Sequence, residues 1–166
     1  MSEDAIVLLK ADHGEIRRLF RDFRKAGAAA HREKGRIVAN VIELLTVHTY
    51  LENEIMYPQV RRLLPDLEDD VLESYEEHHL ADVLTMELWS MNPQDERFDA
   101  KATVLIESVE HHMEEEEESW FPRVRDGLGR KQLQELGAEM IRARAKAPRR
   151  PSQPGAMKKV VKAVTG

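Results

Sequence analysis

The sequence contains no cysteine. A disulfide framework and a thiolate metal site are therefore excluded, and any metal ion must be held by nitrogen and oxygen ligands. The 166 residues contain no apolar run approaching the roughly 18 residues of a membrane span. The N-terminus begins with acidic Glu3 and Asp4 and lacks the long apolar segment of a secretion signal. We therefore expect a soluble cytoplasmic protein with no membrane contact.

Basic residues are scarce over most of the chain. The last acidic residue is Glu139 and eight lysines and arginines follow it, so residues 1–139 contain 17 basic and 31 acidic residues and carry a net charge of −14. A body this acidic is not expected to bind nucleic acid. Residues 148–166 hold three prolines, two glycines and only basic charges, which predicts a disordered basic tail of unknown protein partner. The folded domain is expected to span residues 1–147.

Strand patterns are absent before the tail, whereas apolar residues recur at three- and four-residue steps. We therefore predict an all-α fold, an up-down-up-down four-helix bundle with a short fifth C-terminal helix and a flexible tail. The first helix is expected to be capped by Ser2, and residues 58–65 are expected to form a connection. The predicted helices run from Ser2 to about Gly27, from about Glu33 to Pro58, Leu67 to Met91, Asp99 to Trp120 and Lys131 to Lys146.

One motif occurs twice, from His48 to Pro58 and from His112 to Pro122. Each copy reads His, three residues, Glu, four residues, an aromatic residue and Pro. Residues four apart lie one turn above each other on a helix, so each copy brings an imidazole and a carboxylate together. One such pair arises easily by chance in a chain with 34% charged residues, but the repetition with the same ending does not. Two such pairs on facing helices indicate a two-metal site.

The other two long helices each contribute a histidine to the apolar face. Four histidines and two carboxylates in a small core are costly to desolvate unless cations pair with them. Six ligands exceed the needs of one tetrahedral zinc, and mixed imidazole and carboxylate donors suit iron, manganese or zinc. A ferritin-like site needs Glu-x-x-His on two helices, a spacing that occurs here once, from Glu76 to His79. The candidate ligands are His13, His48, Glu52, His78, His112 and Glu116.

These residues resemble the hemerythrin-like, His-His-Glu cation-binding domains. The resemblance covers about residues 4–145 and rests on Ala11–Ile16, His48–Pro58, Glu77–His79 and His112–Pro122. It implies a non-haem di-iron centre bridged by an oxo or hydroxo group, with a terminal histidine from each helix and bridging Glu52 and Glu116. It also implies a carrier, store or redox sensor for O2, peroxide or NO. The alternatives are an enzyme with catalase-like or ferroxidase activity and an interaction module in which the metal only stabilises the bundle.

Several assignments stay open from the sequence. Oxygen carriers of this family have a fifth histidine one turn after His78, where this chain has Asp82, so Asp82 or a water is expected to fill that position. His79 competes with His78, His111 with His112, and Glu115 with Glu116; the rest of the Glu114–Glu118 run is expected to be a solvated face. Because a bridging carboxylate lacks a counter-charge without metal, Gln in place of Glu52 or Glu116 is expected to leave the metal-free fold at least as stable.

Overall fold

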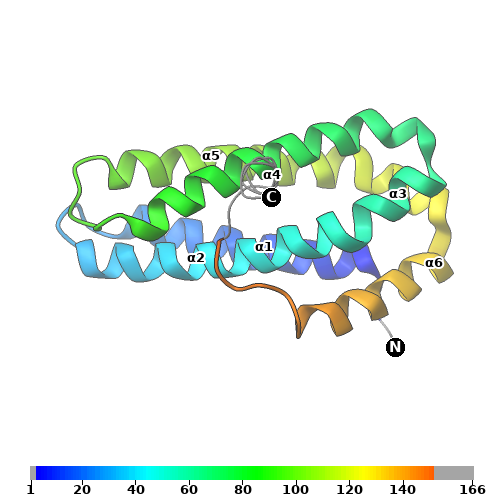
Figure 1. Cartoon of the computed structure of the whole chain (residues 1–166), viewed down its shortest axis with the longest axis horizontal. Helices are drawn as coiled ribbons and strands as arrows, with labels where there is room; N and C mark the ends of the chain where they lie inside the picture. The colour runs from blue at the N-terminus through cyan, green and yellow to red at the C-terminus, as the bar shows by residue number, and fades with distance from the viewer. Residues whose placement is uncertain (1–2, 152–166) are drawn as a thin grey trace, which may run out of the picture.

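The computed structural model describes residues 3–151 of the chain. Four long helices form an up-down-up-down bundle, and a fifth helix lies across its outside (Figure 1). Within the bundle, α1 packs on α2, α2 on α4, α4 on α5 and α5 on α1, whereas α6 packs mainly on α1. The elements are α1 Ala5–Lys25, α2 His31–Leu51, η1 Glu52–Met56, α3 Tyr57–Leu63, η2 Pro65–Leu67, α4 Glu68–Ser90, α5 Phe98–Glu115, η3 Glu116–Trp120 and α6 Phe121–Arg144.

This arrangement confirms the predicted fold and most helix boundaries. Ser2 lies outside the described residues, and the first helix is instead capped by Asp4, whose carboxylate accepts a hydrogen bond of 2.9 Å from the amide of Val7. Residues 58–63 are helical rather than a connection, because α3 continues the second helix. Across residues 3–151, no helix combines the length and apolar character needed to cross a membrane.

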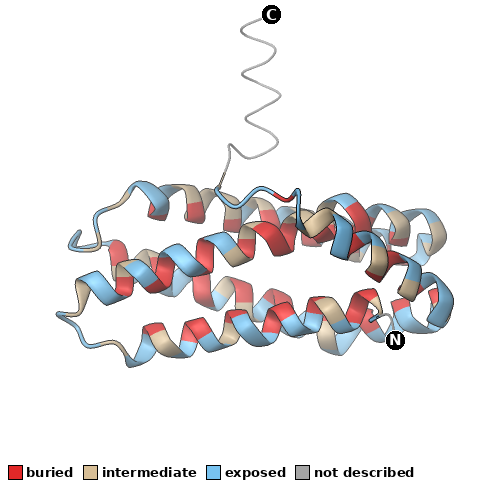
Figure 2. Ribbon diagram, turned by 90° about the horizontal axis from the view of Figure 1, so that it is seen from below, coloured by how far each residue is buried: buried red, intermediate tan, exposed pale blue. Residues whose placement is uncertain are grey.

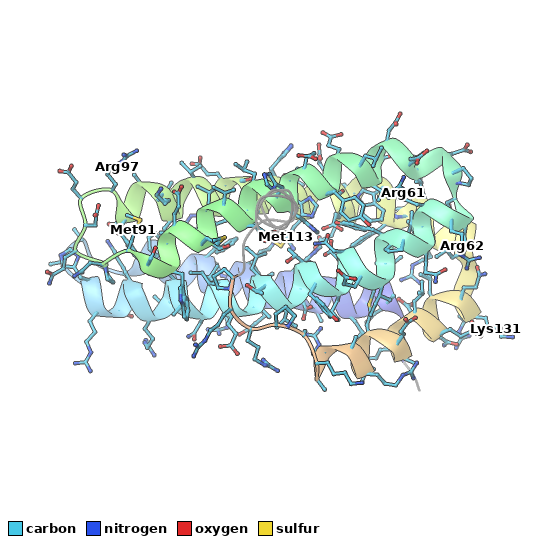
Figure 3. All side chains as sticks on the ribbon, viewed as in Figure 1. Arg61, Arg62, Met91, Arg97, Met113 and Lys131 are labelled. Atoms are coloured by element: carbon cyan, nitrogen blue, oxygen red, sulfur yellow. The ribbon has the colours of Figure 1, made fainter. Side chains whose placement is uncertain are left out.

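On each helix the buried residues lie on the side that faces the neighbouring helices (Figure 2). The buried side chains form two apolar clusters. One includes Leu9 and Leu51, and the other includes Ile16, Leu45 and Met113; Figure 3 shows Met113 near the middle of the bundle. Burying these side chains stabilises the bundle by about 25 cal/mol per Å² of apolar surface. Along α1, His13 lies between Leu9 of the first cluster and Ile16 of the second.

Both copies of the repeated motif contain one π-helical turn. In η1 the amide of Tyr57 donates to the carbonyl of Glu52, five residues earlier, and η3 repeats this pattern. Pro58 and Pro122 follow these turns, and a proline has no N–H and displaces the carbonyl four residues before it. The wider π turn accommodates the proline without ending the helix. Each motif therefore widens its helix at the glutamate and continues beyond the proline.

The fifth helix corresponds to the second half of α6. Gly129 has φ 75°, in the left-handed region that favours glycine, and it divides α6 into two helical parts. After α6 the chain lies against the bundle: Arg149 donates to Glu43 at 3.2 Å and Arg150 lies over the ring of Trp89. The first residues beyond the predicted domain end at 147 thus contact α2 and α4. The remaining residues of the predicted tail, 152–166, lie outside the described residues.

Candidate metal centre

Each of the four bundle helices carries one histidine into the core. None of the four side chains is more than 7% exposed, and we call them the four inner histidines. The structure also buries Glu52 and Glu116 completely. All six predicted site residues therefore lie together in the bundle interior. The four inner histidines are His13 from α1, His48 from α2, His78 from α4 and His112 from α5.

The inward-facing atoms form two groups of possible metal ligands that share one carboxylate. The first group consists of His13, His48, Glu52 and Glu116, and the second of Glu52, His78 and His112, each with ligand atoms within 4.8 Å of one another. Glu52 Oε1 contacts His48 Nε2, while Glu52 Oε2 lies 3.4 Å from His78 Nε2. Glu116 Oε1 lies 2.9 Å from His112 Nε2 and 3.6 Å from His13 Nε2. Both carboxylates thus touch histidines of both groups.

The first group contains buried polar atoms that make no hydrogen bond to any described residue. They are Nε2 of His13 and His48 and Oε1 of Glu52 and Glu116. His48 Nε2 and Glu52 Oε1 lie in close contact as an ion pair, and Glu116 Oε1 lies 2.9 Å from His112 Nε2. Buried polar atoms are normally satisfied, and four of them gathered in one group leave room for a further partner. A divalent cation fits this donor set of two imidazoles and two carboxylates.

The outer nitrogen of every inner histidine has a polar partner. His13 Nδ1 donates to Glu117 at 2.7 Å, His48 Nδ1 to Asp12 at 3.2 Å and His78 Nδ1 to the side-chain oxygen of Asn53 at 2.7 Å. His112 Nδ1 lies 3.3 Å from Glu77. Partners of this kind fix the tautomer and direct the other nitrogen, Nε2, toward a metal.

Sequence reasoning missed these outer partners. It placed Glu117 on a solvated face, but this carboxylate is only 21% exposed and contacts both His13 and Arg17. Asp12 and Glu77 stand directly before inner histidines in the sequence, and Asn53 directly after a site glutamate. That adjacency was the one signal that could have found three of them.

Tyr57 is a further site residue that sequence reasoning missed. Its side chain is fully buried, and its hydroxyl donates to Glu52 Oε2 and lies 3.2 Å from His78 Nε2 and 3.5 Å from His112 Nε2. The π turn places Tyr57, five residues after Glu52, on the inner side. Tyr57 stands beside the second group, and the expectation that Asp82 or a water fills the position of the fifth histidine stays a prediction. The equivalent aromatic of the other motif, Phe121, stacks on His13.

Charge pairing strongly shifts the titration of the buried groups. Burial alone would lower the pKa of His48, but the carboxylates of Glu52 and Asp12 outweigh burial and raise it to about 10. Burial would raise the pKa of Glu52, but its histidine neighbours hold that pKa well below the usual range. Glu52 therefore has a counter-charge without metal. This corrects the expectation that Gln at position 52 leaves the metal-free protein at least as stable. Gln would remove the negative charge that pairs with protonated His48.

Two pockets reach the histidines from different sides. The apolar side chains of Leu45, Ala81, Val109 and Met113 line one, which touches His48, His78 and His112. The other, of about 80 Å³, is lined by acidic and hydroxyl side chains of α4, α5 and η3 and touches His112. The first measures only about 10 Å³ and is mainly apolar, whereas the acidic side chains of the second suit a cation.

The competing sequence candidates lie outside the core. His79 is only partly buried, and His111 is exposed and pairs with Glu115 at 3.3 Å on the surface. His78, His112 and Glu116 are the members of each pair that face the interior. Met56 and Trp120, each four residues after a site glutamate, are buried in the adjoining apolar cluster.

Comparison with known proteins gives three matches. The hemerythrin HHE cation-binding domain profile matches residues 4–124. A DNA nickase of Nostoc sp. is 24% identical over 143 residues, which cover 86% of this chain but only 40% of that protein. The crystal structure of a hemerythrin HHE cation-binding domain-containing protein from Mycobacterium kansasii superimposes with a TM-score of 0.73 at 19% identity, covering 87% of this chain and 86% of the other. The last match reflects a shared fold.

Proposed function

Because this chain belongs to the hemerythrin HHE cation-binding domain family, we propose that its His/Glu centre holds two iron ions and binds or reacts with O2, peroxide or NO. The first ion would take His13 and His48, and the second His78 and His112. Glu52 and Glu116 would bridge them. The observation that carries this proposal is the position of Glu52, whose two oxygens face different histidine groups. Manganese or zinc would suit the same donors.

The surrounding residues fit the chemistry of small ligands. Iron supplies a change of oxidation state and an open coordination position for an oxygen or nitrogen ligand. The mainly apolar lining beside His78 and His112 disfavours an ionic substrate, and the pocket there, of about 10 Å³, would widen to admit a diatomic molecule. Apolar clusters on both sides keep bulk water from the centre. These features support a carrier, store or sensor of a diatomic ligand.

A second candidate is an enzyme that dismutes hydrogen peroxide. Tyr57 supports it, because its hydroxyl is a buried proton donor beside Glu52, His78 and His112. Converting two H2O2 to O2 and two water molecules moves protons between peroxide oxygens, and a positioned hydroxyl can hold and return a proton. Phe121 occupies the equivalent position in the other motif and has no such proton. A Tyr57→Phe variant therefore separates the two candidates.

The test is an absorption spectrum of the iron-loaded protein before and after peroxide addition, with an oxygen electrode in parallel. Absorption bands that form and persist would support a carrier. Oxygen evolution with recovery of the starting spectrum, lost in Tyr57→Phe, would support the enzyme. Colourless protein holding one zinc ion would contradict both and support a metal that only staples the bundle.

The nickase relative raises DNA as a substrate, although this chain spans less than half of that protein. We expect no DNA binding by the acidic residues 1–139, because their net charge of −14 repels phosphates. Incubation of supercoiled plasmid with iron-loaded protein tests this expectation. The control is the metal-site variant His48→Ala. Nicking of the plasmid by wild-type protein but not by this variant would contradict the expectation.

A further inference from the structure

The two groups differ in what holds their histidines. In the first group, each outer carboxylate is itself bound by an arginine. Arg17 donates to Glu117 at 2.8 Å, to the same oxygen that accepts from His13. This chain of contacts fixes the carboxylate and, through it, the imidazole.

The second arginine comes from the C-terminal end of α6. Arg144 donates to both oxygens of Asp12, at 3.1 and 2.9 Å, and Asp12 in turn accepts from His48. The Asp12 side chain is only 11% exposed, so this contact is shielded from solvent. A residue more than 90 positions away in sequence thereby orients a site histidine.

Among residues 3–151, no arginine supports the second group in this way. His78 donates to the neutral amide of Asn53, and Glu77, beside His112, has histidines as the basic neighbours that act on it. Its inward atoms are also already engaged, because the Tyr57 hydroxyl bonds Glu52 Oε2 and contacts both histidines. The first group contains the four buried atoms that make no hydrogen bond to the described residues, and its one close internal contact is the ion pair between His48 Nε2 and Glu52 Oε1.

We propose that the two positions fill in order: the first ion binds at His13, His48, Glu52 and Glu116, and the second follows when the Tyr57 network rearranges. Arg17 and Arg144 are positioning residues for the first ion. The proposal rests on the two-ion centre proposed above.

Arg144 gives the sharpest variant, because it touches neither ion position. Loss of the carboxylate that holds a ligand histidine typically weakens metal binding by about 10–100-fold. Arg144 acts one contact farther out, through Asp12, so Arg144→Met should weaken the first binding step by up to about tenfold and leave the second nearly unchanged. Arg144→Lys keeps a cation beside Asp12 and should restore part of the loss. Arg149→Met is the matched control, because Arg149 lies five residues later and pairs with the exposed side chain of Glu43 rather than with a residue of the centre.

The experiment is calorimetric titration of metal-free full-length protein with Co²⁺ without oxygen. Wild-type protein should bind in two resolved steps, the first at least tenfold tighter. Equal weakening of both steps by Arg144→Met would mark a merely structural role and overturn the positioning claim. A single two-ion step would overturn the order of filling. Wild-type protein that binds fewer than two ions would instead contradict the two-ion centre itself.

A second measurement needs no variant. Crystals of wild-type protein loaded with half an equivalent of Co²⁺ should show an anomalous peak between His13 and His48. A stronger peak between His78 and His112 would overturn the proposed order.

Discussion

Replacing Glu52 with Gln changes one buried charge and almost no volume. Glu52 is 0% exposed, and its oxygens contact His48 and His78. In metal-free protein, the substitution removes the main counter-charge of His48. In metal-loaded protein, it removes the carboxylate that both ions would share. The substitution should therefore lower the stability of the metal-free protein and also lower the number of ions that the protein binds.

The size of the metal-free effect follows from the ion pair. Breaking a buried pair by removing one partner costs about 3–5 kcal/mol. The rise in the pKa of His48 from 6.5 to about 10 corresponds to about 4 kcal/mol at pH 7. Asp12 contributes part of that rise, so about 3 kcal/mol is a fair expectation for Glu52 alone. One kcal/mol shifts the unfolding midpoint of a protein this size by about 2–4 °C, which predicts a fall of roughly 6–12 °C.

Thermal and urea unfolding at neutral pH, with and without metal, measures both effects. The matched control is Glu54→Gln, in the same π turn but on an exposed side chain, which should change stability by no more than about 0.5 kcal/mol. Metal should stabilise Glu52→Gln less than wild type, because fewer ions bind. A metal-free midpoint of Glu52→Gln equal to that of Glu54→Gln would refute the buried pair. A full complement of two ions would remove Glu52 from the bridge.

Three further predictions concern the histidines, pH and the tail. Alanine in place of any of the four inner histidines should reduce the amount of bound metal, as measured by elemental analysis. His31→Ala should not, because the His31 ring contacts the carbonyl of Pro93 away from the centre. Full metal content in two of the four variants would refute the site. Metal-free protein should lose stability as the pH rises from about 6.5 to about 10, because the raised pKa of His48 contributes stability only while the ring is protonated; urea midpoints that rise over this range would contradict the pairing. Deleting residues 148–166 should leave metal content and helical circular dichroism unchanged, because Arg144 is retained and the contacts of Arg149 and Arg150 are exposed; unfolding on deletion would show that the domain extends beyond 147.

Much of the bundle could be predicted from periodicity, because four amphipathic helices of this length have few ways to bury their apolar sides. The repeated motif also identified the facing pairs His48–Glu52 and His112–Glu116. The choice of His78 over His79 followed from Ala81 and similar neighbours on the same face, and both histidines lie as that argument required.

The remainder depended on local geometry that a regular helical repeat does not contain. At 3.6 residues per turn, Met56 should have faced the site, but the π turn shifts the inner position to Tyr57. Proline six residues after each site glutamate was the available signal for that turn. The link from Arg144 to Asp12 depends on how α6 packs across α1, which no short-range pattern specifies.

The central claim is a pair of ions that share Glu52. Its most direct test is the iron content per chain of wild-type protein loaded with ⁵⁷Fe, measured together with the Mössbauer spectrum. The account predicts two iron atoms per chain in a spin-coupled pair. One iron per chain, or two that are magnetically independent, would contradict it.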